Sequence, residues 1–279
     1  MKKIYFVSDF HLGAPTLKES RERETKIVRW LTSIQDDAER IFLVGDIFDF
    51  WFEYKTVVPK GYIRLLGKLA ELRNKGIQID YFTGNHDIWM FEYLNKELGV
   101  SIHKEPFYGR LYDKQFLIAH GDGLGPKDRG YKFLKKYILN TSFFQWLFRW
   151  LHPDLGIRLA LFCSKKSRKV QSKPDFFRGE KNEWLLVYSN EAVSQKPNLD
   201  YCIFGHRHLP LDILLKNQKS RYINLGEWLN SFTYAVFDGQ DLQLCYFEHP
   251  EKRVHPVQYT KENELFDWTE KSHPLNPSD

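Results

Sequence analysis

Five short polar motifs, each at or near the end of an apolar run, constrain the fold of this chain more than any other feature. The first is Asp9-Phe10-His11, which directly follows the apolar run 3–7. The other four are Gly45-Asp46-Ile47-Phe48-Asp49, Gly84-Asn85-His86-Asp87, His120-Gly121-Asp122 and Gly205-His206-Arg207-His208. Short apolar runs rich in β-branched and aromatic residues predict buried strands. Asp, Asn and His side chains are therefore expected to gather at strand ends.

The apolar runs alternate with segments whose apolar residues recur at helical spacing. We expect strands over about 3–8, 40–44, 78–83 and 115–119, and helices over about 19–34 and 62–75. Strands resume at 201–204 and continue at 221–225, 233–237 and 242–247, with Asp238-Gly239 as a hairpin turn. This pattern, with polar motifs at strand ends, predicts an α/β fold whose site lies at the carboxyl edge of a sheet.

The alternation breaks after Gly123, where the chain becomes helical in character, aromatic and basic, without a clear strand. We predict a helical insertion over 123–196, a core formed by 1–122 and 197–250, and a polar surface tail over 251–279. The insertion leaves the core after the His120 motif and rejoins it before His206. It is therefore expected to stand over the site as a cap.

Composition narrows the class of protein. The chain has 279 residues, of which 42% are hydrophobic and 28% charged, which fits a large folded core and argues against disorder. The net charge of +5 suits an anionic substrate or membrane surface. The three cysteines are far apart and predict free thiols in a reducing compartment. With no apolar run near the roughly 20 residues of a spanning helix, and a first strand that ends on a site motif, we expect a cytoplasmic protein, either soluble or lying on a membrane.

The motifs supply a ligand set for two divalent cations. Carboxylate and imidazole ligands suit Mn²⁺, Fe²⁺ or Zn²⁺, and the lack of a cysteine cluster argues against a structural zinc. Two ions need a shared carboxylate, for which Asp46 is the natural bridge. We predict that one ion is held by Asp9, His11, Asp46 and His208. The other would be held by Asp46, Asn85, His120 and His206. Two such ions, roughly 3.5–4 Å apart, can clamp a phosphoryl oxygen and generate a hydroxide for in-line attack.

His86 is expected to act in catalysis, together with Asp46, rather than to bind metal. It could stabilise charge on the phosphoryl group or protonate a leaving oxygen; the alternative is a supporting hydrogen bond to a ligand. Three further motif carboxylates are expected to orient ligand histidines or cap helices rather than to coordinate: Asp49, Asp87 and Asp122.

The five motifs resemble those of the calcineurin-like metallophosphoesterases, over about 3–120 and 201–247. The resemblance implies a β-sandwich flanked by helices and the same division of ligands between the two ions. Flanking residues, among them Ser8, Leu12 and the run Asn224-Leu225-Gly226-Glu227-Trp228, and the helical cap insertion, are similar to the UDP-2,3-diacylglucosamine hydrolase family of lipid A biosynthesis. That similarity implies Mn²⁺-dependent cleavage of the pyrophosphate bond of UDP-2,3-diacylglucosamine to UMP and 2,3-diacylglucosamine 1-phosphate, with peripheral contact at the inner face of the cytoplasmic membrane.

One residue departs from that family. Its well-known members have Gly-Asn-Arg-Asp in the third motif, whereas this chain has His86 at the arginine position, as in the wider superfamily. Arginine suits a pyrophosphate through its fork of donors, while histidine offers proton transfer. The alternative is therefore a sister-branch enzyme acting on another phosphoester, a nucleotide or single-stranded nucleic acid. The aromatic run at 143–151 is too continuously apolar for an open stacking groove, which disfavours nucleic acid. A non-enzymatic scaffold is disfavoured because all seven expected ligands are present.

The insertion combines the aromatic run 143–151 with many basic residues. We interpret it as a lid whose apolar interior holds acyl chains and whose rim meets lipid headgroups; the alternative is a subdomain that buries its aromatic residues against itself. Its candidate substrate-binding residues are Asp128, Tyr131, Ser164, Lys165 and Arg168. The expected partners are a UDP-sugar lipid and the membrane surface, with no protein partner inferred.

Overall fold

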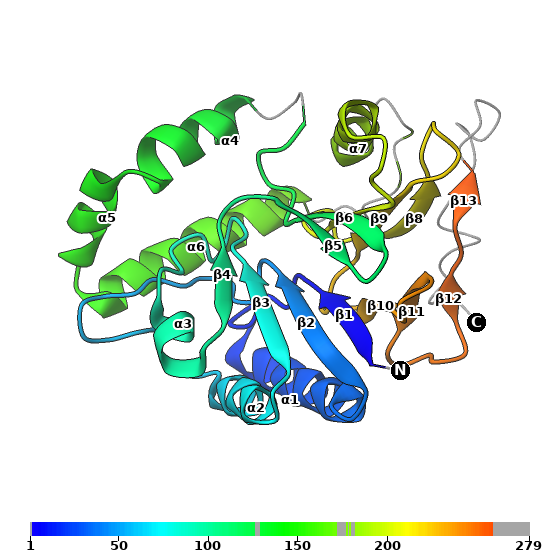
Figure 1. Cartoon of the computed structure of the whole chain (residues 1–279). Helices are drawn as coiled ribbons and strands as arrows, with labels where there is room; N and C mark the ends of the chain where they lie inside the picture. The colour runs from blue at the N-terminus through cyan, green and yellow to red at the C-terminus, as the bar shows by residue number, and fades with distance from the viewer. Residues whose placement is uncertain (1, 126–128, 172–176, 178, 180–181, 259–279) are drawn as a thin grey trace, which may run out of the picture.

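The computed structural model describes residues 2–125, 129–171, 177, 179 and 182–258, which form two β-sheets packed face to face and flanked by helices (Figure 1). The first sheet has seven strands in the order β12-β11-β10-β1-β2-β3-β4. The second has six strands in the order β13-β8-β9-β7-β6-β5. The predicted α/β fold, a β-sandwich flanked by helices, is confirmed.

The first sheet brings three of the motifs to one edge. Four of its strands run parallel to one another: β1 (Lys3–Val7), β2 (Ala38–Val44), β3 (Gln78–Phe82) and β4 (Ser101–His103). Three antiparallel strands continue the sheet beyond β1: β10 (Thr233–Phe237), β11 (Leu242–Tyr246) and β12 (Arg253–Val254). Because β1, β2 and β3 are parallel, the motifs that follow them meet at their common carboxyl edge.

The second sheet carries the other two motifs. Its strands are β5 (Phe107–Leu111), β6 (Lys114–Ala119), β7 (Tyr201–Phe204), β8 (Pro210–Leu214), β9 (Arg221–Leu225) and β13 (Val257–Gln258). β6 pairs in parallel with β7, so the motifs that begin at His120 and Gly205 lie next to each other. The backbone N–H of Gly205 donates to the carbonyl of His120 at 3.0 Å.

The helices lie outside the sheets. Four of them are α1 (Leu17–Ile34) and α2 (Ile63–Asn74) on the first sheet, α3 (Tyr93–Leu98) before β4, and α7 (Trp184–Gln195) on the second sheet. The remaining ones form an arm beside the ends of β3 and β4 (Figure 1): α4 (Arg129–Leu134), the π-helix η1 (Lys135–Leu139), α5 (Ser142–Arg149) and α6 (Pro153–Gln171). Within the described residues, we find no helix with the length and apolarity needed to cross a bilayer.

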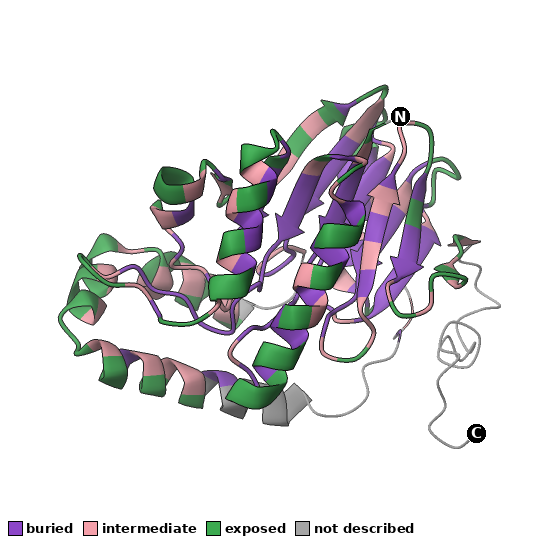
Figure 2. Cartoon of the chain, turned by 90° about the horizontal axis from the view of Figure 1, so that it is seen from below, coloured by how far each residue is buried: buried purple, intermediate pink, exposed green. Residues whose placement is uncertain are grey.

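Three apolar layers hold the molecule together. The layer between the sheets contains stacked aromatic rings, with Phe116 at 5.9 Å from Phe6 and 5.0 Å from Tyr201 between ring centroids. A second layer packs α1 and α2 on the first sheet around Trp30, and a third packs α7 on the second sheet. The central strands are therefore buried on both faces (Figure 2), which is why they read as continuous apolar runs.

Several sequence predictions need correction. Five strands were not expected. β4, β12 and β13 have only two or three residues, β5 is interrupted by Gly109, and β8 begins with Pro210, so none of them gives a clear strand pattern. The start of the predicted tail joins the core, since β12 pairs with β11 and β13 with β8. The helix α7 packs on the second sheet, although the predicted insertion at 123–196 includes it. The helix expected over about 62–75 is present, but its first residue, Ile63, is 79% exposed, because the buried stripe of α2 runs through Leu65, Leu69 and Leu72.

The packing between the sheets predicts a large cost for removing one ring. Phe116→Ala should lower the free energy of unfolding by about 3–5 kcal/mol, because the ring is fully buried among aromatic neighbours and leaves a cavity. Leu17→Ala, at a position that is 71% exposed, should change it by less than about 0.5 kcal/mol. Urea unfolding of both variants measures the difference. A similar small cost for both would contradict the packing described here.

Candidate metal centre

The site lies where loops from both sheets meet, and its backbone is unusual. Asp9, His11, Asp46, His206 and His208 all have positive φ, between 44° and 69°. A left-handed backbone costs a non-glycine residue roughly 1–2 kcal/mol, so surrounding contacts must hold these loops in place. Such strained positions concentrate at functional sites. Every one of these residues was predicted from the sequence to be a metal ligand.

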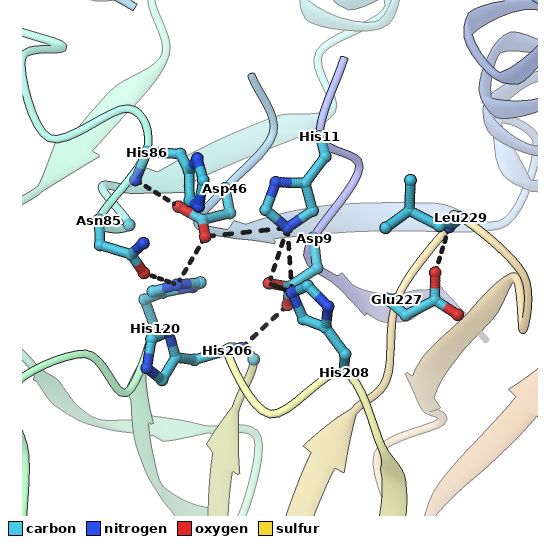
Figure 3. A network of polar contacts seen from close by, with 12 residues as sticks. Asp9, His11, Asp46, Asn85, His86, His120, His206, His208, Glu227 and Leu229 are labelled. Carbon is cyan, nitrogen blue, oxygen red and sulfur yellow. Dashed lines mark hydrogen bonds and ion pairs between the residues drawn. The ribbon is translucent and has the colours of Figure 1, made fainter. Parts of the chain in front are cut away.

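The first group of donors consists of Asp9, His11 and His208 (Figure 3). Asp9 Oδ1 lies 3.2 Å from His208 Nε2 and 3.6 Å from His11 Nε2. The two imidazole nitrogens are 3.0 Å apart. Three donor atoms thus converge on one small volume, within 4.8 Å of one another.

The second group consists of Asp46, His120 and His206, whose donor atoms also lie within 4.8 Å of one another. Asp46 Oδ2 is 3.3 Å from His120 Nε2 and 3.9 Å from His11 Nε2. Asp46 therefore contacts both groups, as a bridging carboxylate would. Asn85 joins the second group, with its Oδ1 at 3.4 Å from His120 Nε2 (Figure 3).

The carboxylates of Asp9 and Asp46 each accept a backbone hydrogen bond through one oxygen, and the other oxygen faces the histidines. Asp9 Oδ2 accepts the backbone N–H of His206 at 3.0 Å, and Asp46 Oδ1 accepts the backbone N–H of His86 at 2.8 Å. Asp9 Oδ1 is buried without a hydrogen-bond partner among the described residues. A buried, unpartnered carboxylate oxygen facing imidazole nitrogens fits a cation. The donor set therefore fits the divalent metals that this chemistry implies.

The electrostatics of the cluster also favour cations. Burial alone would lower the pKa of His11 and His120, but neighbouring carboxylates raise it to about 10 in both, through Asp49 and Asp9 for His11 and through Asp46 for His120. Burial alone would raise the pKa of Asp9 and Asp46, but the surrounding histidines hold it well below its usual range. The carboxylates thus stay ionised, and the raised pKa of the two histidines reflects their negative charge, which a cation would meet once the imidazoles give up their protons to bind it.

Further polar contacts orient the ligand side chains. His120 Nδ1 lies 2.9 Å from the carbonyl oxygen of Val44, an arrangement that leaves Nε2 facing the cluster. Asp87 accepts the backbone N–H groups of Gly84 at 2.7 Å and Ile47 at 2.8 Å, and so ties the second motif to the third. A side chain at Gly84 would overlap the Asp46 carboxylate, so the glycine is required by close approach.

Two arginines near the site escaped the sequence prediction of its residues. Arg23 of α1 is buried and donates through Nη2 to the carbonyl of His11 at 2.7 Å and to that of Ala14. Arg207, between two predicted ligands, forms a buried bidentate pair with Glu183 at 2.8 and 3.0 Å. A lone arginine on a helix, bonded to backbone carbonyls, gives no sequence signal.

His86 stands at the edge of the cluster. Its ring centroid is 4.8 Å from that of His11, and its side chain is 14% exposed. Its Nδ1 lies 3.1 Å from the carbonyl oxygen of Asp49. One of its ring nitrogens also falls within 4.8 Å of donor atoms of His11 and Asp46. The structure thus brings His86 to the predicted ligands; its catalytic role stays a prediction.

The structure shows the contacts of two of the five predicted substrate-binding residues of the cap. Ser164 Oγ donates to the Asp49 carboxylate at 3.0–3.1 Å and lies 3.3 Å from His86 Nδ1, so α6 reaches the site. Tyr131 donates to Asp122 Oδ2 at 2.7 Å. Asp128 and the side chains of Lys165 and Arg168 lie outside the described residues.

Comparison with known proteins defines the class. A family model described as calcineurin-like phosphoesterase matches residues 2–210, and the chain belongs to this family of metal-dependent hydrolases. The chain is 39% identical over 255 residues to a UDP-2,3-diacylglucosamine hydrolase of Porphyromonas gingivalis, an alignment that covers 87% of this chain and 96% of the relative. Within the class, it therefore belongs to the family of proteins that carry this name.

Other relatives are more distant. A UDP-2,3-diacylglucosamine hydrolase of Aeromonas salmonicida is 28% identical over 236 residues, covering 83% of this chain and 88% of the relative. Among solved structures, the Escherichia coli phosphoesterase Yfce is 15% identical with a TM-score of 0.42, covering 91% of this chain and 97% of that one.

The geometry predicts different metal losses for two neighbouring histidines. His120→Ala should remove one of two bound ions, because Nε2 faces Asp46 inside the second group. His86→Ala should keep both ions and lower turnover instead. Metal content by mass spectrometry measures the difference, with His249→Ala, a partly exposed histidine outside the cluster, as the control. Full metal content in His120→Ala would contradict the predicted division of ligands.

Proposed function

We propose that the protein hydrolyses the pyrophosphate bond of UDP-2,3-diacylglucosamine and releases UMP and 2,3-diacylglucosamine 1-phosphate. The observation that carries the reaction class is the convergence of two donor groups on Asp46 in a buried cluster. The substrate is supported by the 39% identity to a protein of that name along 96% of its length. The proposed place of this reaction in lipid A biosynthesis rests on the family resemblance of the sequence motifs.

Two divalent ions, for which we propose Mn²⁺, would be held by the predicted ligands. Asp9, His11, Asp46 and His208 would hold one ion. Asp46, Asn85, His120 and His206 would hold the other. When bound, such a pair supplies an activated hydroxide and positive charge for the phosphoryl oxygens. The neutral amide of Asn85 limits the negative charge of the ligand set, so the pair stays electrophilic.

The chain's own residues would do the remaining work at the phosphorus. His86 Nδ1 is occupied by the Asp49 carbonyl, which leaves Nε2 to meet a phosphoryl or leaving oxygen. Ser164 and Asp49 fix the ring in place. We propose that His86 stabilises the charge on the phosphoryl group or delivers a proton there. If His86 cannot serve a pyrophosphate as arginine does, the protein belongs to a sister branch with another phosphoester as substrate.

The arm formed by α4, η1, α5 and α6 would cover the lipid part of the substrate. Large apolar side chains on it are exposed, among them Trp146 at 53%, Trp150 at 74% and Phe162 at 67%. The rings of Trp146 and Trp150 lie side by side, with centroids 6.0 Å apart, and exposed apolar side chains that gather in this way mark an interaction surface. Phe148 anchors the arm, with its ring centroid 4.7 Å from those of Phe52 and Trp89. We propose that the cap comprises this arm, and that it holds acyl chains.

We also propose that the arm contacts the inner face of the cytoplasmic membrane and makes the protein peripheral there. Exposed basic residues accompany the apolar ones, namely Arg149 and Arg158. Aromatic side chains beside lysines and arginines suit a surface of anionic lipid.

The activity is tested by giving the purified protein UDP-2,3-diacylglucosamine with Mn²⁺ and following UMP release. Release should be fast and should stop when a chelator is added, and Asp46→Asn should abolish it, because the bridging carboxylate is lost. Cleavage of a simple phosphodiester without any UMP release would instead place the protein in a sister branch.

The cap is tested by replacing its exposed indoles. Trp146→Ser with Trp150→Ser should lower co-sedimentation with anionic vesicles several-fold, because both rings are more than half exposed. Metal content should not change, since neither residue is in the cluster. The exposed Val57→Ser variant, outside the arm, is the control. Equal vesicle binding by all three proteins would show that the arm is a self-contained subdomain.

A further inference from the structure

A cavity of about 330 Å³ lies directly beside the metal cluster. His120, a predicted ligand, forms part of its wall together with Gly121 and Asp122. The ends of β3 and β4 form a second wall, and α4 with η1 forms a third. The size is at the lower end of small-molecule sites, which span about 300–1,000 Å³. It suits a nucleotide-sized group rather than a sugar with two acyl chains.

Four lysines line this cavity: Lys104, Lys132, Lys135 and Lys136. Two of them are engaged with the protein, since Lys135 Nζ pairs with Asp122 Oδ2 at 2.6 Å and Lys132 Nζ donates to the carbonyl of Gly125. The lining also includes two carboxylates, Glu105 and Asp122. With four ammonium groups against two carboxylates, the cavity favours an anion.

The charges of the other two lysines, Lys104 and Lys136, are available to a ligand. Among the described residues, neither pairs with a carboxylate; each ammonium lies near a ring instead, at 5.1 Å from Phe91 and 5.2 Å from Tyr137. Both side chains are exposed. They can therefore turn toward a phosphate or ribose oxygen at the cost of a long contact with a ring, without breaking an ion pair to a carboxylate.

One wall of the cavity contains a ring held rigidly in place. His103 stacks on Phe82 with ring centroids 4.7 Å apart and planes inclined by 17°. Its Nε2 lies 2.7 Å from Asp80 Oδ1, and Asp80 is held in turn by Arg40 at 2.7 Å. A fixed aromatic ring gives a flat base a surface that needs no reordering on binding.

The cap and the cavity adjoin different donor groups of the cluster. Ser164 of α6 reaches Asp49 and His86, next to the first donor group. The cavity instead reaches His120 of the second group. A pyrophosphate diester carries one group on each side of the phosphorus that is attacked. The two groups must therefore leave the cluster by different routes.

We propose that this cavity binds the pyrimidine nucleoside monophosphate part of the substrate, and UMP as product, with Lys104 and Lys136 as its charged contacts. The inference rests on the proposed function and assigns a place to the nucleotide part of that substrate. The acylated sugar phosphate then extends the other way, under the apolar arm that includes α6.

The test is titration calorimetry of the Mn²⁺-loaded full-length protein with UMP, and separately with inorganic phosphate. Lys104→Ala with Lys136→Ala should weaken UMP binding about tenfold or more, as expected for lost hydrogen bonds to charged groups. Phosphate binding should change by less than about twofold, since phosphate needs only the ions. Lys18→Ala with Lys219→Ala removes the same charge from exposed sites outside the cavity lining and should bind UMP like the wild type.

Three results would overturn the cavity assignment: no UMP binding by the wild type at millimolar concentration, unchanged UMP binding in the cavity variant, or an equal loss for UMP and phosphate. The lipid substrate is measured separately. UMP binding lost in the cavity variant, with no hydrolysis of UDP-2,3-diacylglucosamine by the wild type, would refute the proposed function and leave the nucleotide site standing.

Discussion

The structure depends on two carboxylates that are each held by a backbone N–H from another loop. Asp9 after β1 is held by His206 after β7, and Asp46 after β2 is held by His86 after β3. The first contact links the two sheets and the second links neighbouring strands of one sheet. In both, the remaining oxygen is left to face imidazoles. The strained ligand loops and the sandwich therefore support each other, and the cluster cannot form without the packed fold.

Much of this arrangement follows from the sequence because the central strands are buried on both faces. β7, β9 and β10 lie at the predicted residues, and the predicted ligands converge. Elements that depend on pairing rather than on local pattern were not foreseen, such as the two-residue β12 and β13. The role of Arg23 was equally hidden, because a side chain bonded to distant carbonyls leaves no periodic trace. The packing of α7 on the second sheet likewise depends on tertiary contact.

The surroundings of the cluster are chemically asymmetric. On one side, α6 brings Ser164 to Asp49 and continues into an arm with exposed aromatic residues. On the other side, a cavity beside His120 is lined by lysines and a fixed His103 ring. Such asymmetry suits a substrate that is apolar at one end and anionic at the other. Selectivity would then come from the two flanks, while the cluster supplies chemistry shared across the calcineurin-like phosphoesterases.

The central claim is that two ions share Asp46 inside this cluster. Anomalous X-ray diffraction from crystals grown with Mn²⁺ measures it directly. The account predicts two manganese peaks roughly 3.5–4 Å apart, one beside Asp9 and His208 and the other beside His120 and His206, with Asp46 between them. A single peak, or two peaks that do not share Asp46, would contradict it.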